Sequence, residues 1–184
     1  MEKQVVISGF GGQGVMLAGE LLAEAGKDEG KNVTFLPSYG PEMRGGTAYC
    51  DVIVSDKPIA SPVIAFPEAA IILNLPSLIK FEPLMKEGGI IILNKTIIPQ
   101  DVKRNDLRVC EIDAQNIAKE LGNEKVTNLI LLSAYIEIEK TVSVESLKKA
   151  LRVFLTGRKE KLIPINEQAI ERGVEEAKKF LSKN

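Results

Sequence analysis

The sequence contains no histidine, and its 184 residues include only two cysteines. The missing histidine excludes Ser-His-Asp and Cys-His catalytic machinery and every histidine-ligated metal site. Cys50 and Cys110 are far apart and form no C-x-x-C pair, so this chain alone cannot hold a four-cysteine iron–sulfur cluster or a cysteine-rich zinc site. We expect both to be buried free thiols, and we expect any enzymatic chemistry to need a cofactor or another chain.

Long apolar runs and a large excess of one charge are also missing. No run reaches the roughly 20 apolar residues that cross a bilayer, and the N-terminal MEKQVVIS lacks the features of a signal peptide. These absences predict a cytoplasmic protein with no membrane partner. The net charge of −1 excludes a broad electrostatic footprint for nucleic acid. The length and the 45% hydrophobic composition predict one globular domain over residues 1–184.

A glycine-rich turn follows the first predicted strand, VVIS at 5–8. Its candidate binding residues follow the spacing G-x-G-x-x-G and are Gly9, Gly11, Gly12, Gln13 and Gly14. A helix pattern begins at Val15, and strand, turn and helix together open a doubly wound α/β domain. Glycines let a ligand approach the backbone, and a helix N-terminus favours an anion. The turn is therefore either an anion-binding site or a tight turn without a ligand.

The second predicted strand, 33–36, ends without the residue that a dinucleotide site needs. Pro37 and Ser38 stand where an NAD-binding domain has a carboxylate for the ribose. Gly14 is followed by Val15 and Met16 rather than by the Lys-Ser/Thr of a P-loop. The sequence therefore disfavours an independent NAD or flavin oxidoreductase.

The least regular stretch is SYGPEMRGGTA at 38–48. Pro41 fixes φ and Arg44 offers a forked cation. A loop after a strand lies at the carboxyl edge of the sheet, where open α/β folds bind ligands. It is either a contact loop for a phosphate, a carboxylate or a partner, or a turn with a solvated arginine, and its eleven residues favour the contact loop. The candidate binding residues in it are Ser38, Tyr39, Arg44, Gly45, Gly46 and Thr47.

The remaining pattern alternates strands and helices. Apolar runs at 49–55, 69–75, 90–93 and 107–112 predict further strands. The chain turns at 56–58 and is extended at 59–62, and a hairpin here would be an antiparallel addition to the sheet. Helix patterns dominate after residue 113, with Asp113, Ser143 and Asn166 as predicted N-caps. The sequence predicts an α/β fold: an open, mainly parallel sheet with helices on both faces and a helical C-terminal third.

Three motifs occur together in order: GFGGQGV at 9–15, SYGPEMRGGTA at 38–48 and DVIVSDKPIASP at 51–62. In this order and spacing the chain resembles the gamma subunit of 2-oxoacid:ferredoxin oxidoreductases, the family of the pyruvate, 2-oxoglutarate, 2-oxoisovalerate and indolepyruvate enzymes. The resemblance covers essentially the whole chain, and the middle motif carries most of its specificity. The EMRGGT form of that motif is similar to the 2-oxoglutarate or branched-chain members.

The resemblance implies a Rossmann-like domain in a multisubunit enzyme. That enzyme decarboxylates a 2-oxoacid on thiamine diphosphate, passes electrons through iron–sulfur clusters to ferredoxin and forms an acyl-coenzyme A. The resemblance places thiamine diphosphate, Mg²⁺ and the clusters in alpha and beta (thiamine-binding) and delta (ferredoxin-like) subunits, so this chain alone would hold none of them. Coenzyme A carries phosphates, so the glycine N–H groups and Arg44 are candidate contacts. The alternative is a structural subunit whose 38–48 loop is an interface.

Overall fold

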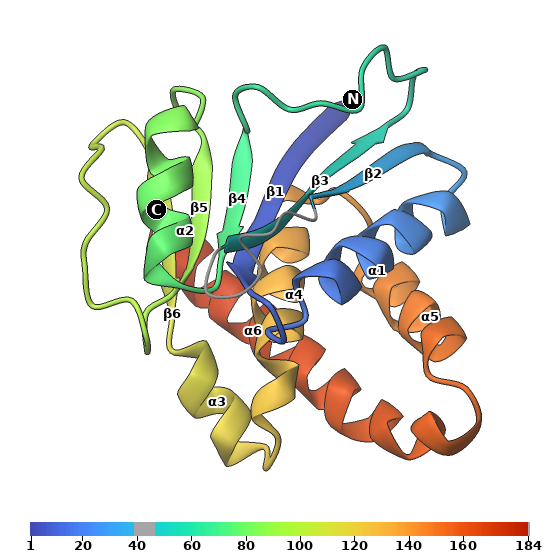
Figure 1. Ribbon diagram of the computed structural model, residues 1–184. Coiled ribbons are helices and arrows are strands. Elements are labelled where there is room, and N and C mark those ends of the chain that lie inside the picture. Colours follow the sequence, from blue (N-terminus) through green and yellow to red (C-terminus); the bar gives the residue numbers. More distant parts are fainter. Residues whose placement is uncertain (39–46, 184) are drawn as a thin grey trace.

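The computed structural model describes residues 1–38 and 47–183. Within them one sheet has the strand order β2-β3-β1-β4-β5-β6 (Figure 1). The strands are β1 (Glu2–Phe10), β2 (Asn32–Ser38), β3 (Thr47–Ser55), β4 (Ala69–Ile72), β5 (Ile90–Asn94) and β6 (Arg108–Ile112). The helices are α1 (Val15–Asp28), α2 (Leu75–Phe81), α3 (Ala114–Glu120), α4 (Thr127–Glu139), α5 (Val144–Phe154) and α6 (Ile163–Leu181), with short 3₁₀ turns η2 (Glu82–Leu84), η3 (Glu124–Val126) and η4 (Gly157–Leu162).

The sheet is mainly parallel, as predicted. The strand pairs β1–β4, β4–β5 and β5–β6 are parallel, whereas β3 is antiparallel to both of its neighbours, β1 and β2. The antiparallel strand expected at 49–55 is therefore β3, but it pairs with β1 and β2, and residues 59–62 form no strand, so the predicted hairpin across 56–58 is wrong. In the sheet, Phe10 is paired with Thr47, and Ser38 is paired with Tyr49. This register brings the end of β1, the end of β2 and the start of β3 to the same edge.

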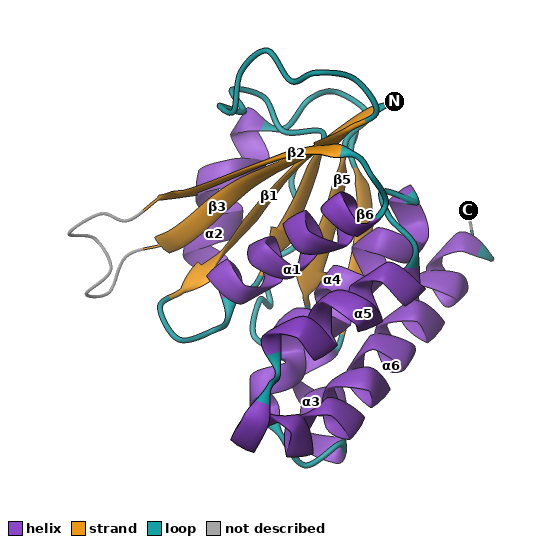
Figure 2. Ribbon diagram, turned by 90° about the vertical axis from the view of Figure 1, so that its right-hand side faces the viewer, coloured by secondary structure: helices purple, strands orange, loops and turns teal. Residues whose placement is uncertain are grey.

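Helices cover the two faces of the sheet unequally. On one face α1 and α4 lie against the strands, and α5 and α6 pack outside them (Figure 2). The other face carries α2, whose Leu78 and Phe81 pack on Val6 and Ile91. Helices on both faces are thus confirmed. None of the helices in the described part of the chain combines the length and hydropathy needed to cross a bilayer.

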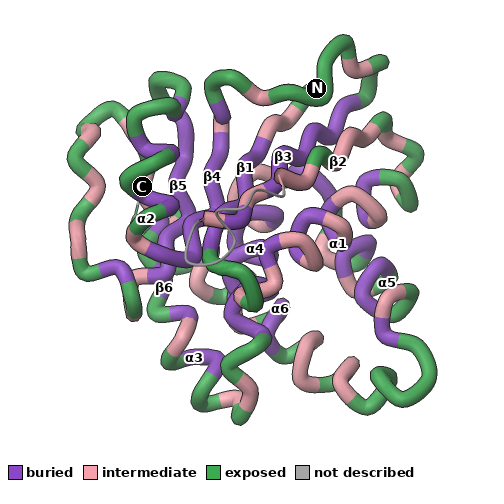
Figure 3. The backbone as a smooth tube through the Cα atoms, in the orientation of Figure 1, coloured by how far each residue is buried: buried purple, intermediate pink, exposed green. Residues whose placement is uncertain are grey.

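The central helix α4 is buried on nearly all sides, from Thr127 through Ile136, because it lies between the sheet and α6 (Figure 3). Helices that are apolar all round occupy such positions. Gly173 makes the close approach of α6 possible: a Cβ there would lie 2.1 Å from the backbone oxygen of Ile130 and 2.1 Å from Ser133 Oγ. The two helices therefore meet where one of them has no side chain.

The predicted caps had different outcomes. Ser143 caps α5 as predicted, since its Oγ accepts a hydrogen bond from Ser146 N at 3.0 Å. Helix α3 begins after Asp113, but the Asp113 carboxylate accepts from the side chain of Asn116 and not from a helix N–H. The prediction for Asn166 is wrong: α6 already begins at Ile163, with a proline in its first turn, a favoured position for that residue.

The two cysteines are buried free thiols, as predicted. Burial raises the pKa of Cys110 to about 12 and raises the pKa of Cys50 well above its ordinary value. Both thiols are therefore protonated at neutral pH and poor nucleophiles. Neither has the character of a catalytic cysteine.

Glu29, just after α1, ties this helix to the start of α5. Its carboxylate accepts from Ser143 N at 2.6 Å and lies 2.8 Å from Lys31 Nζ. Burial raises the pKa of Glu29, but the hydrogen bonds from Lys31 and Ser143 outweigh burial and bring the pKa to about 2, below the ordinary 4.5. A lowered folded-state pKa stabilises the fold above the unfolded-state value, and this stability is lost as the pH falls through the folded-state pKa.

Lowering the pH from about 5 to about 2.5 should therefore reduce the free energy of unfolding of the wild-type chain more than that of Glu29→Gln. We expect the difference between the two reductions to be about 1–2 kcal/mol. Urea titrations at several pH values measure this difference. Parallel pH dependences of the two proteins would show that the Glu29 contacts do not stabilise the fold.

Candidate functional site

The glycine turn lies at the carboxyl edge of the sheet, between the end of β1 and the start of α1. Gly12 and Gly14 have φ of 92° and 75°, in the left-handed region that favours glycine. Ser38 and Thr47, from the predicted contact loop, are placed at this same edge. The other candidates from that loop lie outside the described residues: Tyr39, Arg44, Gly45 and Gly46.

Gln13 joins the turn to β4. Its Oε1 accepts from Phe10 N at 2.6 Å and from Asn74 Nδ2 at 3.4 Å, and its Nε2 donates to Leu73 O at 3.4 Å. The chain goes from β1 toward β2 and from β4 toward β5, in opposite directions, so Gln13 spans the topological switch point of the sheet. The Gln13 side chain thus holds the shape of the turn with protein contacts.

Asn128, near the start of α4, holds the glycine turn through a hydrogen bond. Its Nδ2 donates to Gly14 O at 2.9 Å, and the residue is 2% exposed. A Cβ at Gly14 would lie 2.5 Å from this same Nδ2, so the glycine is required both by its φ and by the space that Asn128 fills. No local sequence pattern marks Asn128, because it acts on a residue 114 positions earlier.

A buried chain of hydroxyl and amide groups lies beside the turn. Ser8 Oγ donates to Ala48 O and is 2.8 Å from Ser77 Oγ, while Asn74 Oδ1 accepts from Ser77 N at 2.9 Å and caps α2. These contacts join β1, β3 and α2 at the edge where the turn lies. They fix the strand ends from which the candidate site is built.

Two pockets flank Gly12. One, of about 260 Å³, is lined by Phe10, Gly11, Gly12, Gly14, Val15, Met16, Leu17 and Ala48. The other, of about 220 Å³, is lined by Gly12, Gln13, Leu73, Gln115, Glu124, Lys125 and Thr127. Helix α1 begins beside the first pocket, and its N-cap, Gly14, offers no side chain to its free N–H groups. Backbone N–H groups at an uncapped helix start can bind an anion such as a phosphate.

Lys125 was not predicted as a site residue, yet it lines the second pocket. Among the described residues it makes no ion pair, whereas the neighbouring Glu124 accepts a hydrogen bond from Gln115 at 2.6 Å. Its position beside the turn depends on the packing of α4 against β4, β5 and α1, which no pattern around residue 125 indicates. The second pocket therefore offers a cation on the far side of Gly12.

Asn94, the last residue of β5, is a further buried polar group toward this edge. It has no exposed surface, and neither its amide oxygen nor its amide nitrogen has a hydrogen-bond partner among residues 1–38 and 47–183. An unpaired buried group costs about 1–3 kcal/mol. Because Asn94 is fully buried and lines neither of the two pockets beside Gly12, it is not assigned to the candidate site.

The strand order disfavours a standard dinucleotide site. In such sites the second strand lies next to the first and carries the ribose-binding carboxylate at its end. Here β3 separates β1 from β2, which places Ser38 two strands, about 10 Å, away from the turn. The described residues also contain no group of three or more Asp, Glu, Cys or His side chains that could hold a metal ion.

Comparison with known proteins identifies the family. Residues 4–176 match the model of the pyruvate ferredoxin/flavodoxin oxidoreductase family, and the chain belongs to this family. It is 38% identical over 181 residues to the ketoisovalerate oxidoreductase subunit VorA of Methanothermobacter marburgensis, which covers 98% of this chain but only 37% of that relative. The chain thus spans well under half the length of this curated relative.

Two further matches cover most of both partners. The 2-oxoglutarate synthase subunit KorC of Methanocaldococcus jannaschii is 34% identical over 154 residues, 82% of each protein. The crystal structure of the keto/oxoacid ferredoxin oxidoreductase gamma subunit from Geobacter sulfurreducens superposes with a TM-score of 0.85 at 30% identity, covering 96% of this chain and 99% of that one. This match confirms the predicted fold class.

Proposed function

We propose that this chain is the gamma-type subunit of a cytoplasmic 2-oxoacid:ferredoxin oxidoreductase and that its glycine edge binds the phosphate-bearing part of coenzyme A. The observation that carries the proposal is the uncapped start of α1 beside Gly11, Gly12 and Gly14, open to a pocket. Ser38 and Thr47 flank the same edge. The relatives are named as subunits of ketoisovalerate, 2-oxoglutarate and keto/oxoacid oxidoreductases, which supports the assignment to such a complex.

The reactive chemistry belongs to other subunits in this proposal. Thiamine diphosphate with Mg²⁺, held by alpha and beta subunits, would supply the carbanion chemistry of decarboxylation. The described residues of this chain do not fit an iron–sulfur cluster, because Cys50 and Cys110 are buried on β3 and β6, which are not neighbouring strands. The clusters are therefore assigned to other subunits such as the ferredoxin-like delta subunit, which passes electrons to ferredoxin.

The role of this chain is to bind and orient coenzyme A. Backbone N–H groups at the start of α1 would donate to a phosphate, and the helix dipole adds to this attraction. Gln13 and Asn128 keep the turn in the shape that exposes these groups. Orientation of this kind lowers the entropic cost of bringing the thiol to the acyl group.

The substrate in this proposal is 2-oxoglutarate or a branched-chain 2-oxoacid. The proposal rests on the EMRGGT segment at 42–47, and the names of the two curated relatives, ketoisovalerate oxidoreductase and 2-oxoglutarate synthase, agree with it. Rates of the purified complex with 2-oxoglutarate, 2-oxoisovalerate and pyruvate test it. A preference for pyruvate would contradict the substrate assignment while leaving the subunit assignment intact.

Arg44→Ala tests the proposed contact with coenzyme A. We expect the KM for coenzyme A of the assembled enzyme to rise about five- to twentyfold, because a charge-assisted hydrogen bond to a phosphate contributes about 1–2 kcal/mol. Arg44→Lys, which keeps the charge but loses the fork, should give a smaller increase. The measurement is a coenzyme A titration at saturating 2-oxoacid.

The same variant separates the two roles of the loop. An unchanged KM with normal assembly would remove Arg44 from coenzyme A binding. Weaker co-purification with the other subunits, with the turnover of the remaining complex unchanged, would instead support the role of an interface element.

A further inference from the structure

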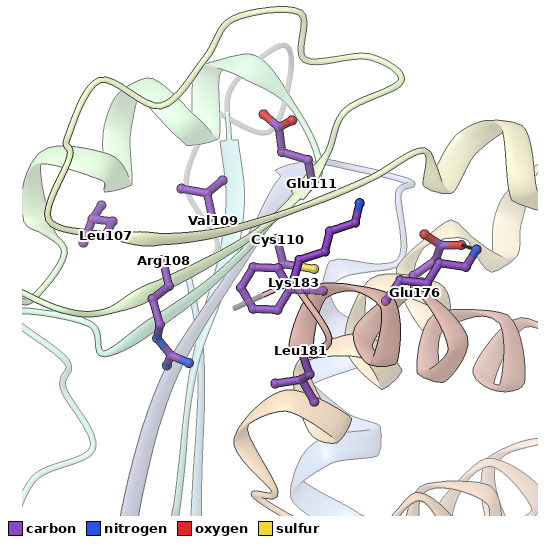
Figure 4. A pocket seen from close by; sticks show the side chains of 10 residues that line it. Leu107, Arg108, Val109, Cys110, Glu111, Glu176, Leu181 and Lys183 are labelled. Carbon is purple, nitrogen blue, oxygen red and sulfur yellow. Dashed lines mark hydrogen bonds and ion pairs between the residues drawn. The ribbon is translucent and has the colours of Figure 1, made fainter.

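A groove of about 810 Å³ runs between β6 and the C-terminal end of α6 (Figure 4). It lies three strands away from the glycine turn, at the β6 edge of the sheet. Strand β6 forms one wall, with Glu111 and Val109 beside Cys110, and the last turn of α6 forms the other. The groove is therefore separate from the proposed coenzyme A site.

The groove exposes backbone hydrogen-bonding groups of β6. Arg108 N donates to Gly89 O at 2.9 Å, and Ile112 O accepts from Lys95 N at 2.8 Å, so both residues bond toward β5. Because alternate residues of a parallel strand bond to the same neighbour, the N–H and C=O groups of Val109 and Glu111 point away from β5. Within residues 1–38 and 47–183 these four groups have no backbone partner.

The charged side chains of β6 do not prevent another strand from pairing with this edge. Natural sheets prevent such pairing with outward charges, prolines or bulges on the edge strand. Arg108 is paired with Glu139 of α4, and Glu111 lies 2.9 Å from Lys95, so both charges are held by this chain's own residues. The opposite edge strand, β2, contains Pro37, which has no N–H to offer. Strand β6 is therefore the edge that can accept another strand.

The helical wall of the groove determines what can lie there. Leu181 is 44% exposed and offers an apolar contact. Lys183, also lining the groove, makes no ion pair with any described residue, whereas Lys179 is paired with Glu176. A polypeptide that fits this groove would form backbone hydrogen bonds with β6, place an apolar side chain against Leu181 and pair a carboxylate with Lys183.

We propose that an extended segment of another subunit of the same complex adds to the sheet as a strand beside β6. Strand addition supplies partners for the outward groups of Val109 and Glu111, and the groove accommodates the side chains of that segment. The inference uses the proposed membership of a multisubunit enzyme but is independent of coenzyme A binding at the glycine edge.

Val109→Pro is the variant that tests strand addition. Proline at position 109 removes one of the two outward N–H groups of β6 and leaves the bonds of Arg108 and Cys110 to β5 in place, and proline is tolerated at such edge positions. We expect at least a tenfold lower yield of co-purified partner subunits for Val109→Pro, and a yield near that of the wild type for Val109→Ala. Circular dichroism of the isolated chain shows whether the fold is retained.

Amide hydrogen exchange of the wild-type protein tests strand addition at β6 without a substitution. We expect the amides of Val109 and Glu111 to exchange at least tenfold more slowly in the complex than in the isolated chain. The Cys110 amide, bonded to β5, is the internal control and should change little. Equal exchange of Val109 and Glu111 in both states, or normal assembly of a folded Val109→Pro, overturns the inference.

The same experiments distinguish strand addition by another subunit from self-association of this chain and from failure of the proposed function. Protection of Val109 in the isolated chain that increases with its concentration would mean that a second copy occupies the edge, and this overturns the assignment to another subunit. A chain that joins no thiamine-dependent assembly at all overturns the proposed function. Assembly of the complex without protection of the β6 amides overturns only the proposed strand addition.

Discussion

Gly12→Asp is expected to raise the KM for coenzyme A at least about tenfold, because a like charge about 4–6 Å from a phosphate costs about 1–4 kcal/mol near a protein surface. Gly12 is the residue that the two pockets of the glycine edge share. A Cβ at this position meets no heavy atom within 4 Å, so a side chain can be added without a collision. The carboxylate would stand where the proposal places a phosphate.

Gly12→Asn is the matched control. Asn and Asp tolerate positive φ similarly well, so both variants bear the strain of the 92° backbone angle, and they differ mainly in charge. We expect Gly12→Asn to raise the KM for coenzyme A by about threefold or less, because the neutral amide does not repel a phosphate. Added salt should reduce the difference between the two variants. Equal KM values for Asp and Asn would show that no anionic group binds beside Gly12.

Gly173→Ala is expected to lower the free energy of unfolding by about 3 kcal/mol or more. Its Cβ would lie 2.1 Å from the backbone oxygen of Ile130, and a backbone atom cannot move without shifting α4 away from α6. Helix propensity works in the other direction, since alanine in a helix interior gains about 1 kcal/mol over glycine. The collision is the larger effect, so the net change is destabilising.

Glu175→Ala, an exposed position two residues further along α6, is the control and should change stability by less than about 0.5 kcal/mol. Thermal and urea denaturation measure both variants. A Gly173→Ala protein more stable than the wild type would mean that propensity dominates and that the contact between α4 and α6 is looser than described.

Local sequence signals predicted much of the fold. The strands were found because short apolar runs bounded by turn residues have few other interpretations. The cap at Ser143 was correct because a hydroxyl three residues before a free N–H is a local device. The start of α6 was missed because η4 runs directly into that helix, which has a proline as its second residue, whereas Asn166 offered a misleading cap pattern.

The candidate site was predicted only in part, because its support is non-local. The glycine spacing marked the turn, but nothing around residue 128 indicates that Asn128 donates to Gly14. The hydrogen bonds that Gln13 donates to Leu73 O and accepts from Asn74 depend on β4 lying beside β1, a pairing that a single sequence does not specify. The separation of β1 from β2 by β3 likewise depends on which strands pair.

The bond between Asn128 and Gly14 also bears on biosynthesis. The donor of this bond leaves the ribosome 114 residues after the acceptor. A nascent chain that has exposed only β1 and α1 lacks the amide that holds Gly14, so it cannot yet present the finished turn. The finished turn therefore forms only after α4 has been synthesised and has packed against α1.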